Sequence, residues 1–189
     1  AHWAGAHLES IIPGMNAKHI QAPTSMNNFP QAVWVRSDGK RFMNEFYPVV
    51  EQRGVPNVYL PREPISCVFD SNFPEYRQYT VPQHGMFSPT TSAIEELKTG
   101  MGKAYQKFKG TWVEPESSKE DNQAGAMFAA PEFIADDTLE GLAKQLGLEG
   151  DAVETFVAEI EKYNKFCEYG IDEDFGRYAE VLFPVKDGP

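Results

Sequence analysis

The pattern of apolar and polar residues predicts a β-hairpin in the first quarter of the chain. Residues 32–36 (AVWVR) are β-branched or aromatic, and residues 41–44 (RFMN) follow the turn sequence Ser-Asp-Gly-Lys. Asp-Gly between two such runs is a strong hairpin signal, because glycine accepts the positive φ angle that the turn requires. A further apolar run, residues 65–70 (ISCVFD), ends in turn residues and predicts a buried strand of the same sheet.

Helical spacing of apolar residues predicts three helices from residue 92 onward. They cover residues 92–110, 138–146 and 151–170, and each ends at or just before a glycine. Ser92 opens a capping-box pattern. Asp151 is expected to cap the last helix, because its carboxylate can accept a hydrogen bond from a backbone N–H of the first turn.

The strands and helices are largely segregated along the chain. A short strand over residues 133–135 is predicted among the helices, without the regular alternation of a doubly wound sheet. We therefore expect an α+β fold in which a small antiparallel or mixed sheet is followed by a helical second half. With 189 residues, 41% of them hydrophobic, the chain is long enough to bury one core and form one compact domain.

Net charge and hydropathy narrow the range of partners. The 28 acidic and 17 basic residues give a formal charge of −11, which repels nucleic acid and anionic membranes. Apolar runs are far shorter than the ~20 residues that span a bilayer. We expect no nucleic-acid partner and no membrane insertion, hence a soluble chain whose compartment its residues do not define.

The motifs of several enzyme classes are absent from the sequence. A nucleotide-binding domain needs a Gly-rich turn between a strand and a helix, and the nearest string, Gly100 to Lys103, lies inside a predicted helix. The four histidines lack the spacing that presents two ligands to one metal. Cys67 and Cys167 are expected to be buried free thiols rather than a disulfide. We expect no metal site, no cofactor-binding residue and no hydrolase chemistry in this chain.

Three segments resemble, in order, the cap domain of one flavoprotein superfamily. Residues 33–45 (VWVRSDGKRFMNE) resemble its strand, glycine turn and Arg-Phe-x-Asn-Glu motif, and residues 65–70 resemble its strand ending in Phe-Asp. Residues 136–175 resemble its closing stretch, with a Thr-Leu-Glu helix, a Tyr-Asn helix end and an acidic loop. The chain is thereby similar to the substrate-side cap domain of FAD-dependent oxidoreductases of the fumarate reductase and succinate dehydrogenase flavoprotein superfamily.

The resemblance implies how the chain is organised. Residues 1–189 form a single cap domain in this interpretation, with residues 1–12 and 184–189 as junctions to an FAD-binding domain of the same polypeptide. Residues 79–132 match nothing in the family and are expected to be an insertion. FAD is then bound mainly by the other domain, and none is expected in this chain.

The resemblance also implies a function. In this family the cap closes over the flavin and clamps a small substrate, while hydride passes to or from a carbon–carbon bond. The parent protein is expected to be an enzyme, either a reductase of an activated alkene or a dehydrogenase. The chain alone is expected to be inactive.

Candidate substrate-binding residues follow from the fumarate-reducing members of the family. These place a Thr-Glu pair before the hairpin, an Arg three residues past that Glu, and a proton-donating Arg four residues past the Asn-Glu motif. At these positions the chain has Thr24, Ser25, Asn28 and Val49. Because neither Ser25 nor Val49 can relay a proton, the resemblance argues against plain fumarate reduction. Thr24, Ser25 and Asn28 are retained as candidate substrate-binding residues.

Two residues are candidates for the missing proton donor. Arg53 lies eight residues past Glu45, where a shifted loop would bring it to the donor position, and its alternative role is that of a surface arginine. Tyr47 competes with it, since a phenol can also act as a catalytic acid. Arg41 and Glu45 flank the hairpin, and we expect them to form a structural, charge-assisted hydrogen bond instead of a catalytic pair.

Two other interpretations concern the surface of the molecule. The acidic residues 172–174 are expected to form a solvated loop, because the pattern of a calcium-binding loop is not continued after them.

The alternative to the flavoprotein interpretation is that the chain is a self-contained ligand- or protein-binding module. In that case Trp3, Trp34 and Trp112 form an interaction surface without redox chemistry.

Overall fold

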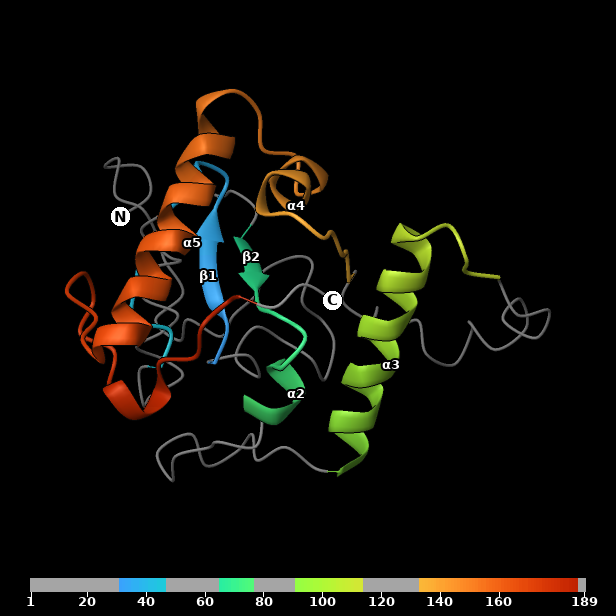
Figure 1. Ribbon diagram of the computed structural model, residues 1–189, viewed down its shortest axis with the longest axis horizontal. Helices are drawn as coiled ribbons and strands as arrows, with labels where there is room; N and C mark the ends of the chain where they lie inside the picture. The colour runs from blue at the N-terminus through green and yellow to red at the C-terminus, as the bar shows by residue number, and fades with distance from the viewer. Residues whose placement is uncertain (1–30, 47–64, 77–90, 114–132, 187–189) are drawn as a thin grey trace, which may run out of the picture.

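The computed structural model describes residues 31–46, 65–76, 91–113 and 133–186, which form two strands and several helices (Figure 1). The elements are β1 (Val33–Arg36), β2 (Ile65–Val68), α2 (Phe73–Tyr76), α3 (Thr91–Phe108), α4 (Leu139–Gln145), α5 (Asp151–Tyr169) and the 3-10 helix η6 (Ala179–Val181). A small antiparallel sheet with helices mostly after it agrees with the predicted α+β class. Among these described helices, none combines the length and the apolar character that crossing a membrane requires.

The sheet consists of β1 and β2 in antiparallel register. Val33 pairs with Val68, and Arg36 pairs with Ile65. The apolar run that begins at residue 65 therefore supplies a strand of the sheet, as predicted.

The predicted hairpin is reduced to its turn. The turn around Gly39 is closed by two backbone hydrogen bonds of 3.0 Å. Beyond it an isolated bridge joins Val35 to Arg41, and residues 41–44 form no second strand. The prediction of a returning strand is wrong because residues 43–46 form a bend and a turn. The side chain of Asn44 accepts a hydrogen bond of 2.9 Å from the backbone N–H of Phe46, and such local bonds compete with the ladder bonds of a strand.

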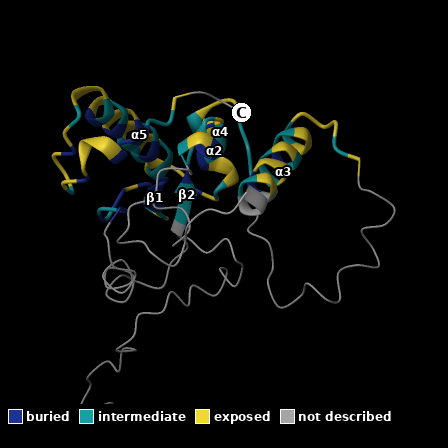
Figure 2. Cartoon of the chain, turned by 90° about the horizontal axis from the view of Figure 1, so that it is seen from below, coloured by how far each residue is buried: buried dark blue, intermediate teal, exposed yellow. Residues whose placement is uncertain are grey.

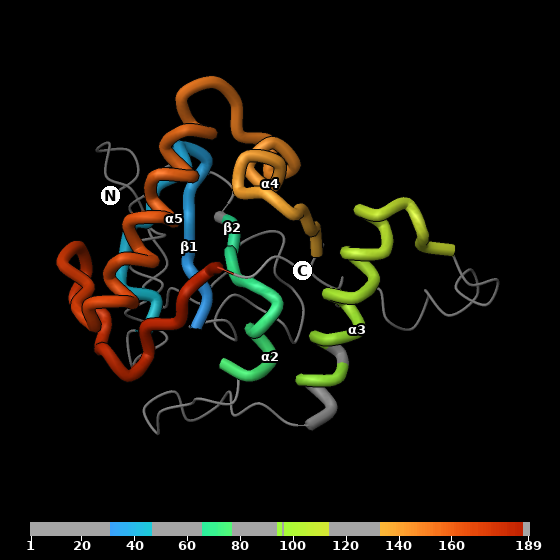
Figure 3. The backbone as a smooth tube through the Cα atoms, in the orientation of Figure 1, coloured from blue at the N-terminus to red at the C-terminus, as the bar shows by residue number. Residues whose placement is uncertain are grey.

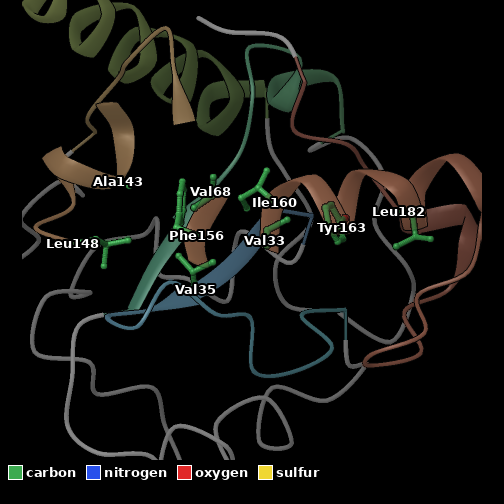
Figure 4. Packing of buried hydrophobic residues seen from close by; sticks show 9 residues of the cluster. All are labelled: Val33, Val35, Val68, Ala143, Leu148, Phe156, Ile160, Tyr163 and Leu182. Atoms are coloured by element: carbon green, nitrogen blue, oxygen red, sulfur yellow. The ribbon is translucent and has the colours of Figure 1, made fainter. Parts of the chain in front are cut away.

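Helices cover both faces of the sheet, on opposite sides of which α5 and α3 lie (Figures 1 and 3). Successive side chains of β1 point to opposite faces. Val33 and Val35 face α5 and enter a first core, shown in Figure 4. This core comprises Val33, Val35, Val68, Ala143, Leu148, Phe156, Ile160, Tyr163 and Leu182. Ala32 and Trp34 enter a second core with residues of α2 and α3, and Figure 2 shows the exposed outer faces of the helices.

The N-terminal part of α5 lies directly against the turn at Gly39. Gly39 has a φ angle of +81°, and a Cβ built on it would lie 2.5 Å from the carbonyl oxygen of Ala152 and 2.8 Å from the backbone nitrogen of Phe156. Only glycine combines this backbone conformation with so close an approach. The Asp-Gly turn thus seats α5 on the sheet.

The helix prediction holds for α3, α4 and α5, with differences at two caps. Gly150 takes the N-cap position of α5, so Asp151 is the first helical residue and not the cap. α3 begins at Thr91, which places Ser92 inside the helix. The differences are of one residue for α5 and two residues for α3, the usual scale of uncertainty for helix ends.

Two further predictions concern the segment 133–135 and the two cysteines. Residues 133–135 form no strand. Instead the ring of Phe133 packs against α3, where a Cβ on Gly100 would lie 2.6 Å from it. Cys67 and Cys167 are free thiols, as predicted, and both are partly rather than fully buried.

Candidate functional site

The candidate residues named from the sequence lie outside the part of the chain that the structure describes. They are Thr24, Ser25, Asn28, Tyr47 and Arg53. Their roles in substrate binding and proton transfer stay predictions. The structure does describe the residues that border the two segments carrying them, Gln31 and Phe46.

Beside these two borders lies a cluster of buried charges, the buried charge network, formed by Arg41, Glu45, Asp172 and Arg177. None of the four side chains is accessible to solvent. Ion pairs join Arg41 to Glu45 at 2.8 Å and to Asp172 at 3.0 Å, and Arg177 to Glu45 at 3.4 Å. Two cations and two anions balance, which is the condition under which charges are buried in proteins.

The carboxylate of Glu45 is the centre of the network. Its Oε1 atom accepts hydrogen bonds from the backbone N–H of Trp34 at 3.1 Å and from Nε of Arg41 at 2.9 Å. Its Oε2 atom accepts from Nη2 of Arg41 at 2.8 Å and from Nη1 of Arg177 at 3.4 Å. A carboxylate has about four acceptor positions, so none is left with which Glu45 could act as a general base.

Asp172 joins the network from the far end of the chain. Its Oδ1 and Oδ2 atoms accept hydrogen bonds from Nη1 and Nη2 of Arg41 at 3.3 and 3.0 Å, and also from three backbone N–H groups that follow it. Desolvation alone would raise its pKa, but Arg41 and the backbone donors outweigh this and hold the pKa of Asp172 below its ordinary value. The prediction of a solvated acidic loop is therefore wrong for Asp172, which pairs with a buried arginine.

Arg177 bonds to backbone carbonyl groups near both ends of the described chain. Its Nη2 donates to the oxygen of Gln31 at 2.9 Å, its Nη1 to that of Ala32 at 3.2 Å and its Nε to that of Val181 at 2.7 Å. One guanidinium group thus ties the residues before β1 to η6. These bonds also satisfy carbonyl groups that would otherwise be buried without a partner.

The ring of Tyr163 lies near both arginines of the network. Its centroid is 4.7 Å from Cζ of Arg41 and 5.7 Å from Cζ of Arg177, within the range of a cation–π contact. Burial raises the pKa of the Tyr163 phenol, which stays neutral. Burial by itself lowers the pKa of Arg41, but Glu45 and Asp172 raise it above its ordinary value. These shifts move the pKa values of Arg41 and Tyr163 further from neutrality, as the shift of Asp172 does, so none of these three groups is poised to exchange a proton near neutral pH.

The network is therefore a structural frame and not an acid–base site. This confirms the predicted charge-assisted bond between Arg41 and Glu45. Sequence reasoning missed Asp172 and Arg177 as their partners. The available signal was that both residues stand in or beside the segment 136–175, which resembles the same family as the hairpin does.

The described residues form no site for a dinucleotide or a metal ion. Their positive-φ glycines lie in turns or at helix ends, and none belongs to the Gly-rich strand–turn–helix that a pyrophosphate requires. In the same part of the chain, no group of three or more His, Cys, Asp or Glu residues is placed to hold a metal ion.

Comparison with curated proteins finds oxidoreductases, while no protein-family model matches the chain. Digoxin reductase of Eggerthella lenta is 42% identical over 53 residues, which are 28% of this chain and 9% of that protein. Vinyl phenol reductase of Lactiplantibacillus plantarum is 37% identical over 59 residues, or 31% and 11%. 3-Oxosteroid 1-dehydrogenase of Mycolicibacterium smegmatis is 28% identical over 161 residues, or 81% and 22%. The chain spans less than a quarter of the length of these relatives.

Comparison with solved structures shows the fold. A 3-ketosteroid-delta4-(5alpha)-dehydrogenase from Rhodococcus jostii, solved with 4-androstene-3,17-dione, matches with a TM-score of 0.50 and 15% identity over 88% of this chain and 25% of that one. The solution NMR structure of a fumarate reductase flavoprotein subunit from Lactobacillus plantarum matches with a TM-score of 0.51 and 18% identity, covering 92% of this chain and 90% of that one.

Together these findings show that the chain is similar in sequence to parts of oxidoreductases and similar in fold to a fumarate reductase flavoprotein subunit. Both similarities agree with the resemblance of residues 33–45, 65–70 and 136–175.

Proposed function

We propose that this chain is the substrate-side cap domain of a flavin-dependent oxidoreductase and is inactive by itself. The observation that carries the proposal is the match to 3-oxosteroid 1-dehydrogenase, which takes in 81% of this chain but 22% of that enzyme. The described residues lack a nucleotide-binding turn, which agrees with a division in which another part of the polypeptide binds FAD. This chain then forms the wall that shields the substrate from water.

The chain's own residues have three tasks in this proposal. Bound FAD supplies hydride transfer to or from a carbon–carbon bond. The cap excludes water, holds the substrate and supplies or removes a proton. Thr24, Ser25 and Asn28 contact the substrate, and Arg53 or Tyr47 carries the proton.

The buried charge network supports these tasks as a frame. Asn28 lies three residues before Gln31, whose carbonyl group Arg177 binds. Tyr47 lies two residues after Glu45 in the chain. Residues that contact a substrate need such rigid anchor points, because a displacement of about 1 Å can lower a rate a hundredfold.

The names of the relatives indicate the class of substrate. They are reductases of digoxin and of a vinyl phenol and dehydrogenases of an oxosteroid and a ketosteroid. A vinyl group is a carbon–carbon double bond, and a dehydrogenase can form such a bond. We propose that the substrate is an activated alkene or its saturated counterpart.

Flavin content tests the proposal directly. The absorbance of the complete gene product and of the 189-residue chain is recorded side by side, and bound flavin is released by denaturation. We expect flavin in the complete product and none in the chain. A complete product without flavin would show that the proposed function is wrong.

A second arm of this experiment concerns the proton donor. In the flavin-loaded complete product, Arg53→Ala or Tyr47→Phe should lower turnover of an activated alkene by about 10²–10⁴ for whichever residue is the donor, with flavin content unchanged. Tyr105→Phe, on α3, is the matched control and should leave turnover unchanged. Equal turnover of both test variants and the control would remove both candidates.

The alternative of a binding module requires three exposed tryptophans, and one of them is buried. Trp34 is 0% exposed and belongs to the second core, so it cannot form part of an interaction surface. Trp3 lies outside the described residues, and Trp112 is partly buried beside Lys103, whose Nζ lies 4.9 Å from its ring. The structure therefore brings no tryptophan surface together among the residues it describes.

A further inference from the structure

One buried arginine contacts both borders of the segments that carry the candidate residues. Gln31 follows residues 24–28, which include the three candidate substrate contacts, and Phe46 precedes residues 47–53, which include the two candidate proton donors. Arg177 donates from Nη2 to the backbone oxygen of Gln31 at 2.9 Å, and its Cζ lies 5.6 Å from the centroid of the Phe46 ring. All three residues are at most 2% exposed. Arg177 thereby links the chain that enters β1 to the chain that leaves the turn after it.

The same guanidinium group supports Phe46 from a second side. Its Nε donates to the oxygen of Val181 at 2.7 Å, and Val181 packs with Phe46 and Phe183 in a third core of buried residues. The backbone N–H of Phe46 in turn donates to the side chain of Asn44 at 2.9 Å. A displacement of Arg177 is therefore passed on to the backbone at Phe46, because a close-packed interior has few voids that could absorb it.

The two arginines of the buried charge network bond to different kinds of group. The side chain of Arg41 donates to the carboxylates of Glu45 and Asp172 at 2.8 to 3.3 Å. The side-chain bonds of Arg177 at 2.7, 2.9 and 3.2 Å all go to backbone carbonyl groups, and its bond to Glu45 is longer, at 3.4 Å. Arg41 thus joins the two anions, whereas Arg177 orients the backbone. Lysine cannot replace Arg177 in this role, because its donors sit on one nitrogen atom and not on a planar fork.

We propose that Arg177 is a positioning residue for the reaction, which holds the segment of the candidate substrate contacts at a fixed distance from the segment of the candidate proton donors. The inference rests on the proposed function, in which residues of the first segment contact the substrate and one residue of the second carries the proton. The side chain of Arg177 is inaccessible to solvent, so it acts through Gln31 and Phe46 and not by touching the substrate. Its loss misaligns the substrate with the proton donor, and a displacement of about 1 Å can lower a rate a hundredfold.

Steady-state kinetics of Arg177→Lys in the complete gene product test this role. The probes are digoxin, a vinyl phenol and a 3-oxosteroid, the compounds in the names of the relatives. Rates are taken per bound flavin, at a temperature at which circular dichroism shows every variant to be folded. We expect kcat to fall about 10²-fold while KM changes less than about threefold, because the substrate still binds but the proton donor is displaced. Arg36→Lys, the same change at a partly exposed arginine that pairs with Asp38, is the matched control and should leave kcat within about twofold. A purely structural role of Arg177 would lower the melting temperature and leave kcat unchanged, and that result overturns the proposal.

Hydrogen exchange is a second measurement, which needs no substrate. In the complete product, peptides that cover residues 21–30 and 47–56 should exchange about tenfold faster in Arg177→Lys than in Arg36→Lys, while peptides of α5 exchange at equal rates. Equal exchange of the two segments in both variants overturns the proposal, and so does exchange at the unprotected rate in the native protein. A native product without flavin and without turnover of the probes shows that the proposed function fails, whereas the exchange rates separately show whether Arg177 holds the two segments.

A second pair of variants keeps the proposal testable if Arg177→Lys does not fold. Phe46→Leu retains an apolar side chain but removes the ring that lies against Arg177. Phe183→Leu makes the same change elsewhere in the third core and is its matched control. We expect kcat of Phe46→Leu to be at least about tenfold below that of Phe183→Leu, with equal flavin content. Equal kcat values of these two variants would contradict the positioning role.

Discussion

Replacing Glu45 by alanine removes the centre of the buried charge network, and we expect it to destabilise the fold strongly. The backbone N–H of Trp34, two donors of Arg41 and one of Arg177 lose their acceptor. Two buried guanidinium groups are then left with the single carboxylate of Asp172. Removing one partner of a buried ion pair costs about 3–5 kcal/mol of unfolding free energy. A domain has about 5–15 kcal/mol in total, so the loss is a large fraction of it.

Urea unfolding of the chain measures this loss. With a slope near 2 kcal/mol per molar urea, the midpoint should fall by about 2 M, followed by tryptophan fluorescence and circular dichroism. Glu173→Ala is the matched control at an exposed acid of the same type, and its effect should stay within about 0.5 kcal/mol. If Glu45→Ala costs less than about 1 kcal/mol, the ion pairs described here do not hold the fold together as we argue. Combining it with Arg41→Ala should cost less than the sum of the two single changes, because the residues share one interaction.

Two remaining predictions concern the turn and the pH dependence. Gly39→Ala should lower the melting temperature, because its Cβ would lie 2.5 Å from the oxygen of Ala152 at a φ angle of +81°. Gly102→Ala, where nothing lies within 4 Å of the added Cβ, should raise stability by up to about 1 kcal/mol; equal effects of the two changes would contradict the close approach of α5. The folded-state pKa of Asp172 is lowered from its ordinary value of 3.8, so its ionised form stabilises the fold above about pH 4 and this contribution is lost as the pH falls through the folded-state pKa. The stability difference between the native protein and Asp172→Asn should therefore narrow below about pH 4, and a difference that stays constant from pH 7 to 3 would argue against this role.

The sequence predicts well those elements whose interactions are local. The turn at Gly39 and the helices α4 and α5 follow from glycine positions and from an apolar period that a few neighbouring residues define. The returning strand at residues 41–44 was predicted from the same kind of pattern, yet it does not form. The turn that Asn44 and Phe46 form in its place depends on one side-chain hydrogen bond, which the apolar pattern does not reveal.

In the candidate site, too, only the interactions between residues close in sequence could be predicted. Arg41 and Glu45 are four residues apart, and their bond could be predicted from the hairpin. Asp172 looks like a solvated acid in a run of acidic residues, and its burial depends on a partner 131 residues away. The end of α5 also lies beside η6, where a Cβ on Gly170 would lie 3.7 Å from the Cβ of Ala179, and periodicity alone does not reveal this approach.

The long sequence separation within the buried charge network has a consequence for synthesis on the ribosome. Translation adds about 5–20 residues per second, and Asp172 lies 131 residues after Arg41, so it is synthesised roughly 7–26 s later. α5, which covers Val33 and Val35, is also made late. Until then the nascent chain exposes an apolar strand, the kind of surface that chaperones bind. Termination of translation before residue 172 yields a product that contains both strands but lacks the carboxylate that closes the network around Arg41.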